Sequence, residues 1–108
     1  MAEKPRDLEL RTAEFAASVR IFVRQLPRTV SNCEDVKQLV RSSGSVAANC
    51  IEANEALGGK DRIMRFRTSR KEAKESQLWL RLLYTNDDTA LQTQRQALWQ
   101  EAHKLSSF

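Results

Sequence analysis

The chain has 108 residues, of which 41% are hydrophobic and 30% are charged, and it carries a formal net charge of +4. This length indicates a single domain covering residues 1–108, and the balance of residue types excludes an intrinsically disordered chain. Apolar runs last only a few residues, whereas a membrane helix needs about 20, so we expect no membrane span. The polar start of the sequence predicts that there is no signal peptide, and we therefore expect a cytoplasmic location.

The first two predicted helices follow from repeated apolar positions. A helix over about residues 7–25 is predicted because its apolar positions alternate between spacings of four and three, and Pro27 ends it. A second helix is predicted over about residues 33–57, with Ser31 and Asn32 as N-cap candidates and Gly58-Gly59 as the stop. The expected core stripes are Leu8, Thr12, Phe15, Val19, Phe22 and Leu26, then Val36, Leu39, Val40, Ser43, Val46, Ala47, Cys50, Ile51 and Leu57.

Two further helices complete the prediction. Asp61 begins a third over about residues 61–84, and Asn86-Asp87-Asp88 supplies turn and cap chemistry for a fourth over about residues 88–105. Their expected apolar sides are Ile63, Phe66, Ala73, Leu80 and Tyr84, then Ala90, Leu91, Leu98, Ala102 and Leu105. Short connections favour antiparallel neighbours, so we predict an all-α, antiparallel up-down-up-down four-helix bundle.

A run of small residues in the second helix predicts close helix packing. Gly44 in mid-helix costs about 1 kcal/mol relative to alanine, and contact between neighbouring backbones offsets that cost. Trp79 and Trp99 fall beside the main stripes, where they cover either a subunit interface or a wide intrachain core, while base stacking is disfavoured without interleaved aromatics. The residues expected in packing or interfaces are Gly44, Ser45, Ala48, Asn49, Glu52, Trp79 and Trp99.

We expect no catalytic residue, no metal site and no cofactor. Asn49 and Glu52 are positioned for a polar contact between helices or subunits, but no histidine, nucleophile or metal cluster accompanies them. Cys33 and Cys50 lie 17 residues apart, about 25 Å along one helix, which is too far for a disulfide, and they are interpreted as small apolar fillers. His103 is the only histidine. The sequence therefore predicts a protein that is not an enzyme.

The third helix holds the charge imbalance of the chain. Between Asp61 and Tyr84 there are seven basic and three acidic residues, and the resulting +4 equals the net charge of the whole protein. Five of the basic residues share one helix face, which predicts contact with a phosphate backbone: Arg67, Arg70, Lys71, Lys74 and Arg81. The alternative is a solvated face of ion pairs with Glu72 and Glu75. The candidate nucleic-acid-binding residues are Arg62, Arg65, Arg67, Arg70, Lys71, Lys74 and Arg81, with Arg20 and Arg24 on the first helix.

Three segments, Arg41–Ala53, Lys60–Arg62 and Arg70–Leu80, resemble the motifs of the four-helix bundle family that is also called the ribosomal RNA intervening-sequence or S23-type family. The resemblance implies an antiparallel bundle that assembles as a ring-shaped homopentamer. Some relatives are encoded inside intervening sequences of large-subunit ribosomal RNA genes. Others are accessory proteins of diversity-generating retroelements and look like partners of nucleic acid and reverse transcriptase. No enzymatic activity is associated with the family.

Two hypotheses for function follow. The first is a non-enzymatic, oligomeric bundle that binds nucleic acid, either structured RNA or an RNA–protein complex, through the basic surface of the third helix. DNA is a possible ligand of the same surface, because the contacts expected are with phosphates. The second is a structural scaffold, a ring that binds a protein partner such as a reverse transcriptase.

Overall fold

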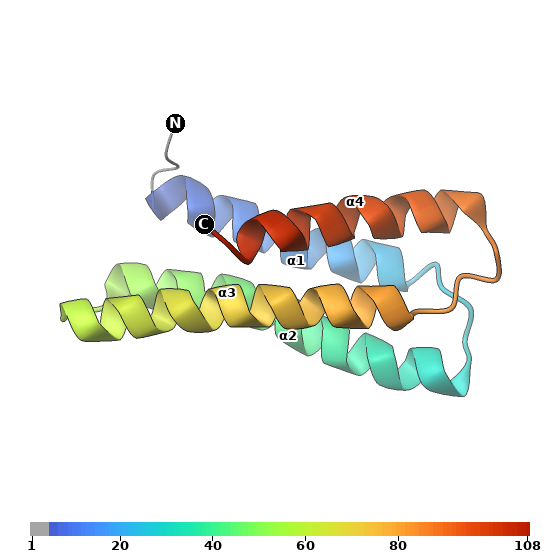
Figure 1. Ribbon diagram of the computed structural model, residues 1–108, viewed down its shortest axis with the longest axis horizontal. Helices are drawn as coiled ribbons and strands as arrows, with labels where there is room; N and C mark the ends of the chain where they lie inside the picture. Colours follow the sequence, from blue (N-terminus) through green and yellow to red (C-terminus); the bar gives the residue numbers. More distant parts are fainter. Residues whose placement is uncertain (1–4) are drawn as a thin grey trace.

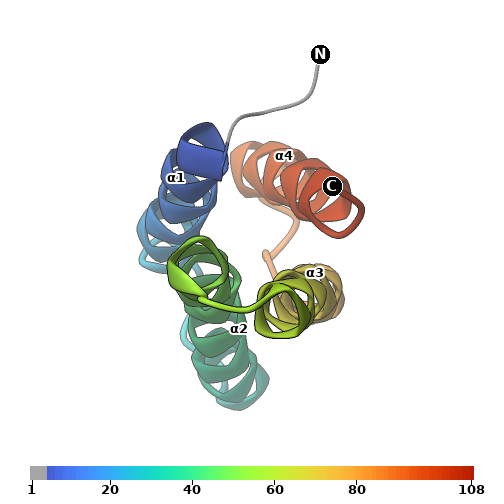
Figure 2. The same ribbon diagram turned by 90° about the vertical axis from the view of Figure 1, so that its left-hand side faces the viewer.

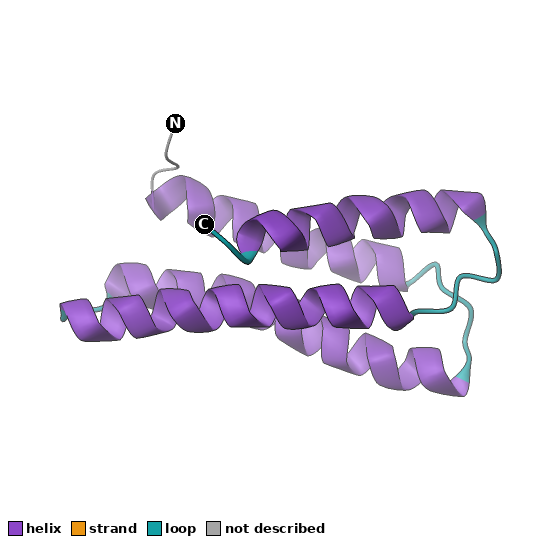
Figure 3. Cartoon of the chain, in the orientation of Figure 1, coloured by secondary structure: helices purple, strands orange, loops and turns teal. Residues whose placement is uncertain are grey.

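Four antiparallel helices make up the fold. The computed structural model describes the backbone of residues 5–108 and the side chains of residues 7–108. The helices are α1 (Pro5–Val23), α2 (Val30–Glu55), α3 (Gly59–Leu82) and α4 (Thr89–Leu105), and this part of the chain contains no strand (Figures 1 and 3). Seen end-on, α1 and α3 occupy opposite corners, and each lies between α2 and α4 (Figure 2). The predicted all-α bundle is confirmed. None of these helices is both long and apolar enough to span a bilayer.

The helix ends differ from the predicted ones by a few residues. Thr29 caps α2 and accepts a hydrogen bond of 3.0 Å from the Asn32 amide, so Ser31 and Asn32 lie inside the helix and their prediction as caps was wrong. Gly58 precedes α3, which therefore includes Lys60. Asp88 caps α4 as expected and accepts from the Leu91 amide at 3.0 Å.

The core is close to the predicted one, with exceptions near helix ends. Every position of the predicted α1 stripe is buried, from Leu8 to Leu26. Leu57 is fully exposed because α2 ends at Glu55, before the stripe reaches it. The buried side of α3 consists of Ser69, Glu72, Ala73, Ser76 and Leu80. The remaining predicted core positions that are exposed are Ile51, Ile63, Tyr84 and Ala90.

Buried serines form the contact between α2 and α3. The Ser69 hydroxyl donates to the Val46 carbonyl at 2.8 Å, and the hydroxyl oxygens of Ser42 and Ser76 lie 2.8 Å apart. A side chain as short as serine reaches a backbone carbonyl of the next helix only where the two backbones approach closely. The small residues of α2 therefore serve close packing, as their run in the sequence predicts.

Gly44 lies next to a side chain of α1 and not next to α3. A Cβ at this position would lie 3.2 Å from Nη2 of Arg20, the one side chain of α1 that reaches it. The Arg20 guanidinium donates to the Ala16 carbonyl at 2.9 Å and to the Val40 carbonyl at 3.4 Å. Gly44 thus gives space to an arginine that joins α1 to α2.

Asn32 joins two loops at one end of the bundle. It is 2% exposed, and its amide group donates to the Pro27 carbonyl at 2.9 Å and to the Tyr84 carbonyl at 2.8 Å. Its side-chain oxygen accepts from the Tyr84 amide at 2.9 Å. The loop between α1 and α2 is thereby fixed to the segment that leaves α3.

Replacing Asn32 by leucine removes all three hydrogen bonds and leaves the backbone groups of Tyr84 and Pro27 without this partner. We expect the free energy of unfolding to fall by roughly 2–4 kcal/mol. Urea unfolding followed by far-ultraviolet circular dichroism measures it. Cys33→Ser, at the exposed neighbouring position, is the control and should change stability by less than about 0.5 kcal/mol. Equal stability of Asn32→Leu and the control would contradict this role.

Candidate nucleic-acid interface

The acidic residues of α3 are held on the side that faces α2. Nη2 of Arg41, on α2, lies 3.4 Å from a carboxylate oxygen of Glu72 and 3.4 Å from one of Glu75. Arg65 lies 2.7 Å from Glu52 of α2 and 3.7 Å from Asp61. All three carboxylates of α3 therefore have a basic partner within or across this helix pair.

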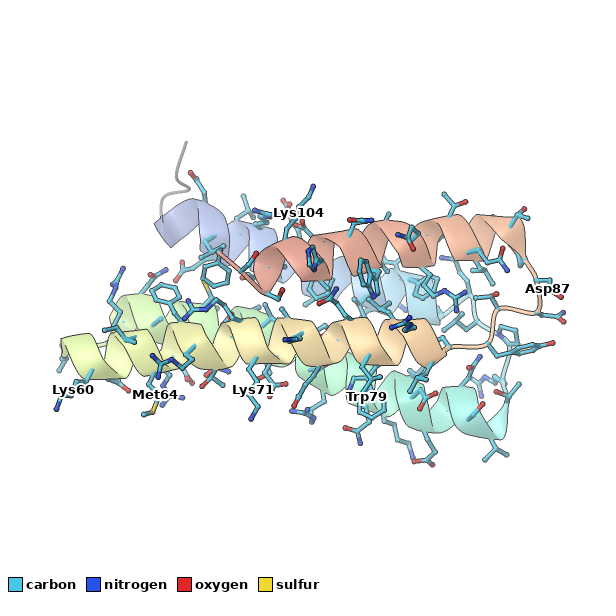
Figure 4. All side chains as sticks on the ribbon, viewed as in Figure 1. Lys60, Met64, Lys71, Trp79, Asp87 and Lys104 are labelled. Atoms are coloured by element: carbon cyan, nitrogen blue, oxygen red, sulfur yellow. The ribbon has the colours of Figure 1, made fainter. Side chains whose placement is uncertain are left out.

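Five basic residues form a line on the outer side of α3. Lys60, Arg67, Lys71, Lys74 and Arg81, here called the basic stripe, follow one another at spacings of seven, four, three and seven. They share one helix face and extend over about 32 Å. All five are exposed, and none is ion-paired within the described part of the chain. Figure 4 shows Lys60 and Lys71 projecting from the same side of α3.

Lys60 is not among the predicted binding residues. The predicted helix begins at Asp61, whereas α3 begins at Gly59. With the observed bounds, α3 holds eight basic and three acidic residues, a formal charge of +5. The spacing of seven between Lys60 and Arg67 was the signal that could have included it.

The other predicted basic residues of α3 lie beside the stripe in separate environments. The guanidinium carbon of Arg62 lies 5.2 Å from the centre of the Phe66 ring, and that of Arg70 lies 5.7 Å from the centre of the Phe108 ring. The two phenyl rings meet edge to face at 5.8 Å. Arg62 and Arg70 thus cover an aromatic contact between α3 and the end of the chain.

Arg20 and Arg24 do not extend the basic stripe. Arg20 is half-buried between α1 and α2, where it bonds the Ala16 and Val40 carbonyls. Arg24 is exposed and borders a hollow at the loop between α1 and α2, together with Arg28 and Lys37. Because α1 and α3 lie at opposite corners of the bundle, these residues form a separate basic region (Figure 2).

The predicted packing residues Asn49 and Glu52 of α2 have separate partners. Asn49 donates to the carbonyl and the hydroxyl of Ser45, at 2.9 and 3.0 Å, while Glu52 reaches across to Arg65. The Asn49 amide and the Glu52 carboxylate therefore each have a partner other than one another. Ala48 is exposed.

Both tryptophans are half-buried and pack against the core cluster. Trp79 lies on the side of α3 that faces α2 (Figure 4), and its indole Nε1 is buried without a hydrogen-bond partner. The Trp99 ring stacks on the His103 ring, with centres 5.6 Å apart and planes 4° from parallel. The two side chains lie one helical turn apart on α4.

A groove runs between α3 and α4, beside the basic stripe. Its walls are Lys74, Gln77, Leu78 and Arg81 on α3, and Arg95, Gln96 and Trp99 on α4. Arg95 is not among the predicted binding residues, and its guanidinium donates to the Leu83 carbonyl at 2.5 Å. No spacing within α4 indicates that contact, because it depends on how α4 packs against the end of α3.

The environment of Glu72 perturbs its titration. Burial raises its pKa above the ordinary 4.5, the nearby Glu75 carboxylate raises the pKa further, and Arg41 opposes both effects. No cluster of three or more metal-binding side chains occurs in the described residues. The candidate site therefore consists of the positive charge of the basic stripe and the aromatic ring of Trp99 in the groove beside it.

Comparison with known proteins identifies the family. The profile of the 23S rRNA-intervening sequence protein family matches residues 8–107. The chain belongs to this family. A protein of unknown function from the S23 ribosomal protein family of Bacteroides thetaiotaomicron has a similar solved structure, with a TM-score of 0.78 and 25% identity over 96% of this chain and 92% of that one. No curated protein matched. The resemblance that the three motifs carry is confirmed.

The raised pKa of Glu72 predicts a pH dependence of stability. The folded protein binds this proton more tightly than the unfolded chain, so the free energy of unfolding falls as the pH rises from about 4.5 through the raised pKa. Glu72→Gln removes this loss because glutamine stays neutral. Relative to wild type, the variant should therefore gain stability in urea unfolding as the pH rises from about 4.5.

Glu55→Gln, at an exposed position outside this cluster, controls for removal of one carboxylate. If the difference between Glu72→Gln and wild type stays constant over this pH range, or shifts against the variant, then burial does not control the titration of Glu72.

Proposed function

We propose that this protein is a non-enzymatic, oligomeric helical bundle that binds structured RNA, alone or within an RNA–protein complex, in the cytoplasm. The observation that supports this most strongly is the basic stripe: five exposed cations in one line, while the carboxylates of the same helix are paired along the side that faces α2. The membership of the chain in the 23S rRNA-intervening sequence protein family agrees with an RNA ligand.

The unpaired state of the stripe favours phosphate binding. A lysine or arginine that is already ion-paired must exchange one anion for another, whereas an unpaired one only releases the counterions of the phosphate. The stripe extends over about 32 Å, which exceeds the length of several nucleotides along a strand. Long side chains on a convex helix reach phosphates more readily than base edges, so this contact holds RNA without reading its sequence.

Exposed apolar residues beside the stripe support self-association. Met64 and Leu82 lie on the outer side of α3 and are 65% and 52% exposed. Covering such side chains is a favourable contribution to assembly, and the motifs of this chain resemble those of proteins that form homopentameric rings. The same residues favour the second candidate function, a scaffold whose ring binds a protein partner such as a reverse transcriptase.

Filter binding of structured RNA over a salt series tests the RNA proposal. The triple variant Arg67→Gln, Lys71→Gln, Lys74→Gln should bind more weakly than wild type. The slope of log K against log salt should fall in magnitude by roughly 2, because each lost phosphate contact removes about 0.7–0.9.

A matched triple variant separates the basic stripe from net charge. Arg28→Gln, Lys37→Gln, Lys104→Gln removes the same charge from exposed positions outside α3 and should bind nearly as wild type does. Equal losses in the two triple variants, or wild-type binding that salt does not weaken, would refute the RNA proposal.

Light scattering on these samples should give a mass above the 12.4 kDa of one chain, and a monomer would refute the oligomeric part. A protein partner that remains bound after nuclease treatment would favour the scaffold.

A further inference from the structure

The groove between α3 and α4 combines positive charge with an aromatic ring. It consists of two adjoining hollows of about 310 and 330 Å³, and Arg81 and Trp99 border both. Lys74 borders the hollow on the α3 side, and Arg95 borders the other. Trp99 thus lies among three cationic side chains that come from two helices.

The Trp99 ring is arranged as a stacking surface. His103, one turn further along α4, lies parallel to the indole at 5.6 Å. Arg95 lies one turn earlier on the same helix, and it borders a hollow together with the indole of Trp99. A second ring therefore supports the indole, which also borders the open space of both hollows.

The charges around Trp99 are not neutralised by neighbours. No carboxylate borders either hollow. The one acidic residue of α4, Glu101, pairs with Arg11 of α1 at 2.7 Å, and the acids of α3 face α2. Arg95 is held by its bond to the Leu83 carbonyl. An anion that enters the groove meets cations whose carboxylate competitors lie elsewhere.

We propose that this groove binds an unpaired nucleotide of RNA, with its base stacked on Trp99 and its flanking phosphates against Lys74, Arg81 and Arg95. This inference rests on the proposed RNA-binding function and deepens it, because it names the part of the RNA that the protein recognises. A base within a duplex has both faces occupied by its neighbours, whereas an unpaired base presents a free face to an aromatic side chain. Three cations around the indole would be costly to bury against an apolar protein segment.

The fluorescence of Trp99 tests the inference directly. The protein has two tryptophans, so Trp79→Phe makes Trp99 the only indole fluorophore. Titration with a single-stranded oligoadenylate of about ten nucleotides should quench its emission, because stacking brings a base onto the ring. A fully paired RNA duplex should bind without comparable quenching.

Affinity measurements complement the fluorescence. Trp99→Leu keeps an apolar side chain against the core and should weaken binding of the single strand by at least about five-fold, as expected for loss of one stacked base. Binding of the duplex should stay nearly unchanged, and Trp99→Phe should be intermediate. If Trp99→Leu fails to fold, quenching in the Trp79→Phe protein still decides the matter.

The outcomes separate this inference from the RNA proposal. Salt-dependent binding of single strands without quenching of Trp99 overturns the stacking site and leaves the RNA proposal standing. Failure of the wild-type protein to bind any RNA overturns both. Quenching by polyglutamate but not by the oligonucleotide would assign the groove to an acidic protein segment and would also overturn the inference.

Discussion

The hydrogen bond from the Ser69 hydroxyl to the Val46 carbonyl, at 2.8 Å, shows how closely α2 and α3 approach, and the charge distribution of the protein depends on that approach. At this separation Arg41 of α2 reaches both Glu72 and Glu75, and Glu52 reaches Arg65. Each of these contacts holds a carboxylate at the junction of α2 and α3. The line of the basic stripe contains cations and no acids, although the helix as a whole contains both.

The separation of charge gives two neighbouring surfaces with different chemistry. The basic stripe is convex and suited to phosphates, whereas the groove beside it places an indole among cations. Lys74 and Arg81 belong to both surfaces. An RNA in which a paired stem adjoins an unpaired nucleotide would engage the stripe with its backbone and the groove with its free base. Recognition of this kind depends on RNA structure more than on sequence.

The fold could be predicted from the sequence, whereas much of the candidate site could not. Apolar spacing within α1 fixes which side is buried, and the cap chemistry at Asp88 fixes where α4 begins, because both are local. Lys60 was missed since glycine can precede a helix as well as end one. Arg41 lies 31 residues from Glu72, so their contact follows only from the packing of α2 on α3. In the sequence, His103 is only a lone histidine, and base stacking on Trp99 is disfavoured for lack of neighbouring aromatic residues. In the structure the His103 ring stacks on Trp99 and supplies the missing aromatic neighbour.

The most direct test of the account compares the stabilities of Arg41→Gln and Lys71→Gln by urea unfolding at low salt, without RNA. If α2 holds the acids of α3, then Arg41→Gln leaves the buried Glu72 beside Glu75 and should lower the free energy of unfolding by about 1–2 kcal/mol. Lys71→Gln should change it by less than about 0.5 kcal/mol, because Lys71 has no partner to lose. Equal losses from the two substitutions would show that the basic stripe is itself ion-paired, and would contradict the account.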